Sequence, residues 1–315
     1  MTANLSEEKR REWHGRLAVA LMASSAADPE ALVEHFQASG DRERAGEYAV
    51  LAGDKAVATL AFERAARFYS EALELQKLTE VETHRLRWKL GDAFANGGFG
   101  AQAARAYLAA VVGASAADAI ELRRVAAEQY LRSGHTREGL AVLREVLAAV
   151  GLAMPKAPWQ SLVGILLYEA NFRLRGYAFP RRDASQVSTE VLRRIDVCAT
   201  AGSSLGMTDN IRGSYFVKRA VFLALHAGEL DRVAYAMVGE VMSVSLAGGR
   251  SLKRLDHVLS VARELAERVN TPKALGFFHT HEACSAYLCG RLKAGRCARS
   301  QGRTWKGRPS GPPVG

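Results

Sequence analysis

Apolar residues recur at steps of three and four along most of the chain. Between Asp41 and Leu75 the recurring positions are Ala61, Ala65, Phe68, Ala72 and Leu75. This spacing places them on one face of a helix, which must be buried against a neighbouring element. No stretch alternates apolar and polar residues with a period of two for long, so we predict an all-α fold with almost no sheet.

The same pattern returns further along the chain. One set of small and aromatic residues aligns with a second set at an offset of 38 residues, from 53 to 91: Gly53, Ala65, Tyr69 and Ala72 match Gly91, Ala103, Tyr107 and Ala110. A weaker third copy follows 36 residues later, from 91 to 127, with Ala127, Tyr130, Gly139 and Leu143. Small residues are expected where two helices of a pair approach closely, so the repeat predicts stacked helical hairpins.

The middle copy resembles the tetratricopeptide (TPR) repeat, whose period is about 34 residues. It departs from that pattern because Trp88 lies one position from the expected aromatic, and Ser115 stands where a proline would close the repeat. The resemblance implies a TPR-like α-solenoid of stacked antiparallel hairpins. The signature residues, which we interpret as structural, are Gly53, Ala65, Tyr69, Ala72, Leu90, Gly91, Phe94, Ala103, Tyr107 and Ala110.

Two longer runs, Leu32 to Ala56 and Trp13 to Ala18, carry a second resemblance. They are similar to the helical region that follows the ATPase module in bacterial STAND/AAA-type signalling proteins. Those proteins are linked to serine/threonine kinase, nucleotide cyclase or DNA-binding output domains. The resemblance extends over about Glu12 to Lys293 and implies that this chain is a fragment of such a protein. It further implies a regulatory role without the ATPase itself.

Turn signals divide the chain into three predicted segments. Residues 1–150 are predicted to form TPR-like helical repeats, and residues 151–293 a second helical repeat segment. The boundary falls in Gly151 to Pro158, where two prolines end any helix. The predicted helices of the first segment after residue 41 are Arg42–Leu60, Phe62–Leu78, Glu82–Ala95, Ala101–Val112, Ala117–Arg132 and Arg137–Val150. A helix Trp159–Arg175 and four or five more are predicted in the second.

Residues 294–315 are rich in Gly, Arg and Pro and lose helical periodicity, so we predict a disordered basic tail. Seven of the ten net positive charges lie between Arg291 and the last residue, and the remaining chain is close to neutral. We expect this end to be a truncation or an altered reading frame.

The composition, 48% hydrophobic and 24% charged, is that of a globular protein. The sequence contains no run of eighteen apolar residues, so we predict no membrane span. The longest apolar run, Leu162 to Tyr168, is too short. The N-terminus lacks the pattern of a signal peptide. Four cysteines without motif spacing suit a reducing compartment, so we expect a cytoplasmic protein.

We find no motif that predicts catalysis, a cofactor or a metal ion. His279 and His281 resemble a ligand pair, but they point about 200° apart on a helix and cannot share an ion there. A phosphate-binding Gly-x4-Gly-Lys-Ser/Thr loop is absent from the sequence. His35 and His226 are interpreted as core or capping residues. Trp88, Tyr107 and Tyr130 are interpreted as packing aromatics, with a place in a partner groove as the alternative.

The leading hypothesis is therefore a non-catalytic helical-repeat module for protein–protein interaction and regulation, whose partner is a protein, a peptide or a neighbouring ATPase or kinase domain. The first alternative is a nucleic-acid-associated protein that acts through the basic tail. The second is an enzyme with a pocket near Gly151 to Pro158. We predict that the chain is not an enzyme.

Overall fold

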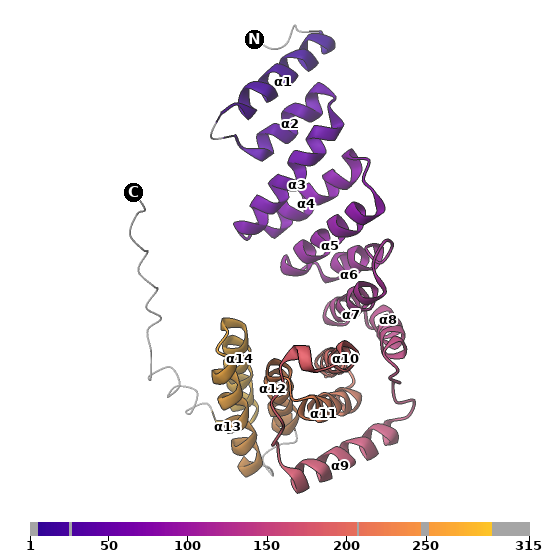
Figure 1. The fold of residues 1–315 in the computed structure, drawn as a ribbon, viewed down its shortest axis with the longest axis vertical. Coiled ribbons are helices and arrows are strands. Elements are labelled where there is room, and N and C mark those ends of the chain that lie inside the picture. Colours follow the sequence, from indigo (N-terminus) through magenta and orange to yellow (C-terminus); the bar gives the residue numbers. More distant parts are fainter. Residues whose placement is uncertain (1–5, 25–26, 207, 247–251, 292–315) are drawn as a thin grey trace, which may run out of the picture. The chain divides into compact units, whose positions relative to one another are not determined.

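The structure is a computed structural model that describes residues 6–24, 27–206, 208–246 and 252–291. These residues form fourteen α-helices and no β-strand (Figure 1), and a single isolated parallel bridge joins Arg182 to Glu229. The all-α prediction is confirmed. The predicted disordered tail, 294–315, lies outside the described residues.

Contacts divide the chain into two compact units, Met1–Met154 and Pro155–Gly315. The helices of the first unit are α1 Glu7–Met22, α2 Pro29–Ser39, α3 Arg42–Ala58, α4 Phe62–Leu75, α5 Glu80–Asn96, α6 Gly100–Ala109, α7 Ala116–Arg132 and α8 Thr136–Ala149. Those of the second are α9 Pro158–Arg175, α10 Thr189–Leu205, α11 Asn210–Ala227, α12 Leu230–Leu246, α13 Leu252–Val269 and α14 Pro272–Leu288, with a short 3₁₀ helix Ala184–Gln186.

Consecutive helices of the first unit pack against one another, from α1 and α2 through to α7 and α8 (Figure 1). The helices are joined by short turns into antiparallel pairs, and the buried faces between them are lined mainly by alanine, with a few aromatic residues. Small side chains let neighbouring helices approach closely, and neighbours supply the burial that one hairpin lacks. The predicted solenoid of stacked hairpins is confirmed.

At each of two repeat glycines, Gly53 and Gly91, the ring of a tyrosine from the next helix packs against the glycine. Gly53 lies inside an unbroken α3, where a Cβ atom would come within 2.4 Å of the Tyr69 ring. A Cβ atom on Gly91 would come within 2.5 Å of the Tyr107 ring. Each tyrosine hydroxyl donates a hydrogen bond to the aspartate that follows the glycine, Asp54 at 2.6 Å and Asp92 at 2.7 Å. Glycine is therefore required because the ring occupies the space of its side chain.

The first helix of three successive hairpins begins at a residue whose side-chain oxygen accepts a backbone hydrogen bond. These residues are Asp41, Thr79 and Ser115. Ser115 Oγ accepts from the Asp118 amide at 3.1 Å. The residue that departs from the TPR pattern therefore serves as the N-cap of α7, a position where serine is among the favoured residues.

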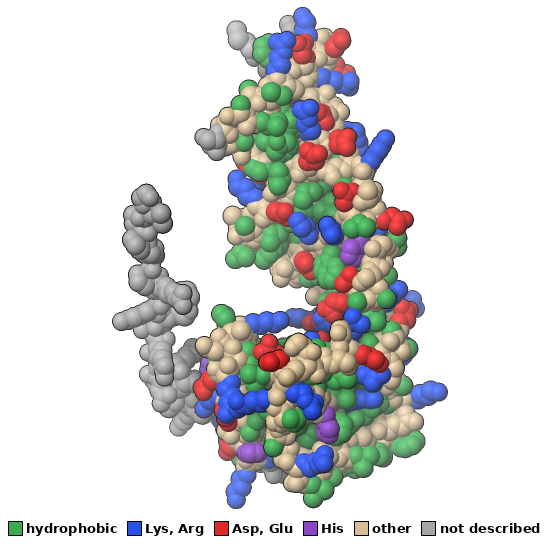
Figure 2. Space-filling model, viewed as in Figure 1, with side chains coloured by type: hydrophobic (Ala, Val, Ile, Leu, Met, Phe, Trp, Pro, Cys, Tyr) green, Lys and Arg blue, Asp and Glu red, His purple; other side chains and the backbone are tan. Residues whose placement is uncertain are grey.

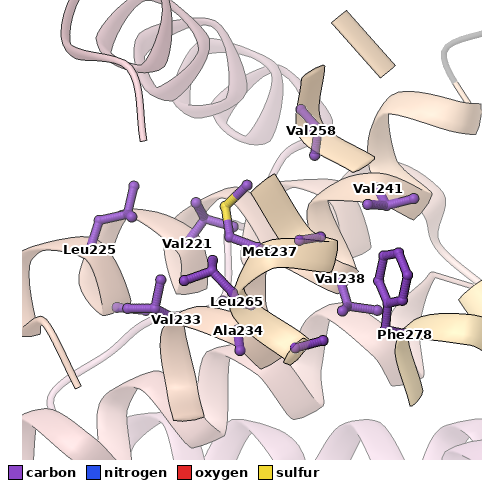
Figure 3. Close-up of a cluster of buried hydrophobic side chains, with 14 of the residues drawn as sticks. Val221, Leu225, Val233, Ala234, Met237, Val238, Val241, Val258, Leu265 and Phe278 are labelled. Atoms are coloured by element: carbon purple, nitrogen blue, oxygen red, sulfur yellow. The ribbon is translucent and has the colours of Figure 1, made fainter. Parts of the chain in front are cut away.

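The core of the second unit is built from α11, α12, α13 and α14, and Figure 3 shows part of it. Val221 and Met237 lie near the centre of this view, Val241 lies closer to Phe278, and all four side chains are buried. Phe278 belongs to α14, which packs against α12. This core combines alanines with many branched residues, mainly valine and leucine, and α12 contacts helices beyond its immediate neighbours. α9 packs against α11 at the side of this core.

Candidate functional site

Helix α9 exposes an apolar face to solvent. Its members are Trp159, Leu162, Val163, Leu166, Leu167 and Leu174. At 100° per residue they fall within an arc of roughly 140° on one side of the helix. Leu166 is 68% exposed and Leu174 is 87% exposed. In Figure 2 hydrophobic side chains gather over α9 along the lower edge of the second unit. We call this set the α9 face.

The opposite side of α9 is also apolar, and it is the side that packs on α11. Ser161 and Phe172 are buried there. A Cβ atom on Gly164 would come within 2.5 Å of the Tyr215 ring, so the two helices approach closely at this glycine. Because α9 is held in the fold by this second face, the exposed residues are not needed to attach it. Scattered exposed apolar residues are normal in proteins, whereas contiguous exposed apolar sets are typical of protein–protein or membrane interaction sites and of ligand grooves.

A hollow of about 260 Å³ adjoins the α9 face. Leu162 and Ile165 of α9 form one wall, and Ile211 of α11 and Leu246 of α12 stand on the other side. Asn210, Ser214 and Ser243 add polar groups to its lining. Sites for small organic ligands usually exceed about 300 Å³. The hollow is closer in size to a site for one or two side chains of a partner.

Charged residues from three helices line the inner part of this hollow. Lys218 Nζ lies 2.5 Å from Glu169 Oε1 and 2.5 Å from Glu240 Oε1. Arg254 pairs with the same two carboxylates. Glu169, Lys218 and Arg254 line the hollow, whereas Glu240 is fully buried behind them. Two cations and two anions thus tie α9, α11, α12 and α13 together with no net charge.

The surroundings of each carboxylate determine its pKa. Burial would raise the pKa of Glu169, but hydrogen bonds from Arg254 and Lys218 outweigh burial and lower it. Burial raises the pKa of Glu240 despite the attraction of Lys218 and Arg254. A general base needs a pKa near the working pH and access to its substrate. Glu169 has the access but is held ionised by two cations, and Glu240 is out of reach of the hollow. This cluster is suited to holding helices together.

The residues singled out from the sequence lie elsewhere. The repeat signature belongs to the first unit, where Tyr69 and Tyr107 are buried against Gly53 and Gly91. Tyr130 is also buried, and Trp88 is half-buried with its ring edge-on to His84.

The histidines have local partners. His279 Nδ1 lies 3.3 Å from Glu282 Oε2, and His281 Nδ1 lies 2.8 Å from the Phe277 carbonyl oxygen. His35 lies against His14, with Nδ1 atoms 3.1 Å apart, and His226 Nδ1 lies 2.8 Å from the Phe222 carbonyl oxygen. Within the described part of the chain, no group of three or more His, Cys, Asp or Glu residues is arranged to hold a metal ion.

Comparison with known proteins finds no family model that matches the chain and no curated protein that matches it. No helix among the described residues combines the length and the apolar character that crossing a membrane requires.

The sequence reasoning missed both the α9 face and the charged cluster. A signal for the face was present, because α9 has apolar residues on two opposite sides and only one side can pack on a single neighbour. A signal for the cluster was weaker. Lys218 and Glu240 interrupt apolar stretches of α11 and α12, but nothing in their spacing shows that they meet.

Proposed function

We propose that this chain is a helical-repeat module for protein–protein interaction. The observation that carries the proposal is the α9 face, a contiguous apolar surface on a helix already secured by its other side. Stacked hairpins offer extended surfaces to partners and do not depend on a reaction centre. The charge-neutral cluster behind the hollow gives that surface a rigid support.

The regulatory part of the proposal rests on the sequence resemblance to the repeat region of STAND/AAA-type signalling proteins. In this proposal the chain acts in the cytoplasm and controls a neighbouring ATPase or kinase domain, and it performs no catalysis itself. The alternative, a nucleic-acid-associated protein, is favoured by one observation, the seven cations after Gly290. Removal of residues 291–315 would then abolish nucleic-acid binding, which would fall steeply with salt.

The experiment is a scan with a photoreactive amino acid placed one at a time at exposed positions of the whole chain. Leu166 represents the α9 face, and Leu51, Val81 and Tyr287 represent exposed apolar positions on α3, α5 and α14. We expect a discrete protein adduct from at least one position, formed with a partner that binds the purified chain at a fixed stoichiometry. Four positions without any adduct would overturn the proposal.

A further inference from the structure

We propose that the α9 face and its hollow bind an amphipathic helix of a partner protein whose acidic end lies against Arg173. This inference rests on the proposed function and names the chemistry of the partner. The length of the face indicates the length of the partner helix that can cover it. From Trp159 to Leu174 the rise along the helix axis is about 22 Å, which a partner helix of about 15 residues covers.

The charged residues around the face indicate the sign of the charge that the partner carries. Arg173 lies at the C-terminal end of the face and within its arc, and Arg175 follows in the same turn. Neither arginine has an ion pair among the described residues. The only acid in α9 is Glu169, which is already bound to Lys218 and Arg254. A partner with Asp or Glu at one end of its apolar stripe therefore complements the surface, and a basic partner is repelled.

The same charges argue against a second copy of this chain as the occupant. A two-fold antiparallel pair of α9 helices would bring Arg173 against Lys156 and the positive end of the partner helix. A parallel pair would bring Arg173 against Arg173. Both arrangements set like charges opposite one another, with no free acid in α9 to relieve them.

The hollow favours a protein partner over a lipid surface. It is continuous with the face through Leu162, and its lining includes the polar groups of Asn210, Ser214 and Ser243. A peptide can place an apolar side chain in the hollow and hydrogen-bond these groups, in the manner of helix-in-groove recognition. Hydrocarbon tails would cover the same groups without hydrogen bonds, which is costly.

The test is selection from a displayed library of peptides of about 15 residues, with leucine at helical spacing and the other positions randomised. The bait is the whole chain, and the Leu166→Asp variant is used for counter-selection. We expect the enriched peptides to carry Asp or Glu at one end. Their affinity should fall at least about tenfold in both Leu166→Asp and Arg173→Glu. It should be unchanged in Leu51→Asp, the same substitution at an exposed leucine of α3.

Several results would overturn the inference. One is a lack of enrichment over Leu166→Asp, and another is enriched peptides without acidic bias or insensitive to Arg173→Glu. Binding to phosphatidylserine vesicles with no peptide enriched would assign the face to a membrane instead. A dimer in sedimentation equilibrium that Leu166→Asp abolishes would assign it to a second copy. If the photoreactive scan captures a partner only from Leu51, Val81 or Tyr287, the proposed function stands and this inference fails.

Discussion

Single glycines determine how closely the first unit packs. Gly91 has no room for a Cβ atom, because the Tyr107 ring fills that space and its hydroxyl is held by Asp92. The next hairpin packs its two helices with a different pair of residues. At the positions 36 residues later it carries Ala127 and Leu143, both fully buried. Ala127 is larger than Gly91, and Leu143 is smaller than Tyr107, so the increase in volume on one helix is offset by the decrease on the other.

The variant Gly91→Ala should destabilise the protein by about 1–3 kcal/mol, because the buried ring cannot move aside freely. Adding Tyr107→Leu should recover part of that loss, since the pair then matches Ala127 and Leu143. The measurement is chemical denaturation of the wild type, both single variants and the double variant. Strictly additive effects of the two substitutions would contradict the packing argument.

The buried cluster of the second unit predicts a pH-dependent variant. Lys218→Met leaves the Glu240 carboxylate buried without its amine, which should cost about 3–5 kcal/mol at neutral pH. Glu240 already has a raised pKa in the fold, above the usual 4.5, and losing Lys218 should raise that pKa further. A carboxyl group with a raised folded-state pKa favours the fold at low pH and loses that contribution as pH rises through the folded pKa.

The deficit of Lys218→Met relative to the wild type should therefore shrink as the pH is lowered from 7 towards the ordinary carboxyl range. Denaturation at several pH values measures it. Lys253→Met serves as the control, because Lys253 is exposed on α13 and belongs to no ion pair among the described residues. A deficit that stays constant with pH would show that Glu240 is not the group left uncompensated.

Within the elements, three helices of the first unit, α3, α5 and α7, end in the same kind of turn. After α5 and α7 the chain turns through a glycine in the left-handed region, Gly98 at φ 83° and Gly134 at φ 84°. After α3 the equivalent residue is Leu60, at φ 60° and 73% exposed. In all three turns the following amide bonds back to a carbonyl five residues earlier. A leucine in this conformation carries a steric cost that glycine avoids.

Leu60→Gly should therefore stabilise the protein, by about 0.5–1 kcal/mol, because it removes the left-handed cost and loses little buried surface. The midpoint of thermal or chemical unfolding measures the gain. The reverse change, Gly98→Leu, is the matched control and should destabilise, because leucine is strained at φ 83°. No atom lies within 4 Å of the position that its Cβ would take, so a steric clash would not contribute to the loss. A loss of stability in Leu60→Gly would mean that the side chain contributes more than the turn.

The elements also show how far the sequence could be read. Periodicity and caps predicted the helices, and α3 and α7 begin within a residue of their predicted starts. Two predicted ends, Leu78 and Val112, were three residues too long, because α4 and α6 stop at Leu75 and Ala109. The apolar pattern continues past both helices, while the turn is determined by what the next helix packs against.

The α9 face was not predicted for a related reason. Periodicity shows which residues share a side of a helix, and α9 shows apolar residues on both sides. Which side is covered depends on the approach of α11 at Gly164, a tertiary contact that sequence spacing does not contain. The charged cluster was missed because its four members come from four helices.

At the scale of the whole molecule, each unit has hydrophobic clusters of its own. Units with separate cores are expected to fold independently. Lys156 lies in the segment between α8 and α9 and is exposed. Limited trypsin digestion should therefore cut after Lys156 early, and both products should keep their helical circular dichroism. Products that lose their helicity after this cut would show that the units depend on each other.

We propose that this chain binds a protein partner through the α9 face. The decisive measurement is a calorimetric titration of three forms of the chain with the partner captured by the photoreactive scan. We predict that the wild type and Leu51→Asp bind with equal affinity and that Leu166→Asp binds at least about tenfold more weakly, with its unfolding midpoint unchanged. Equal affinity in all three forms would show that the partner does not bind at the α9 face.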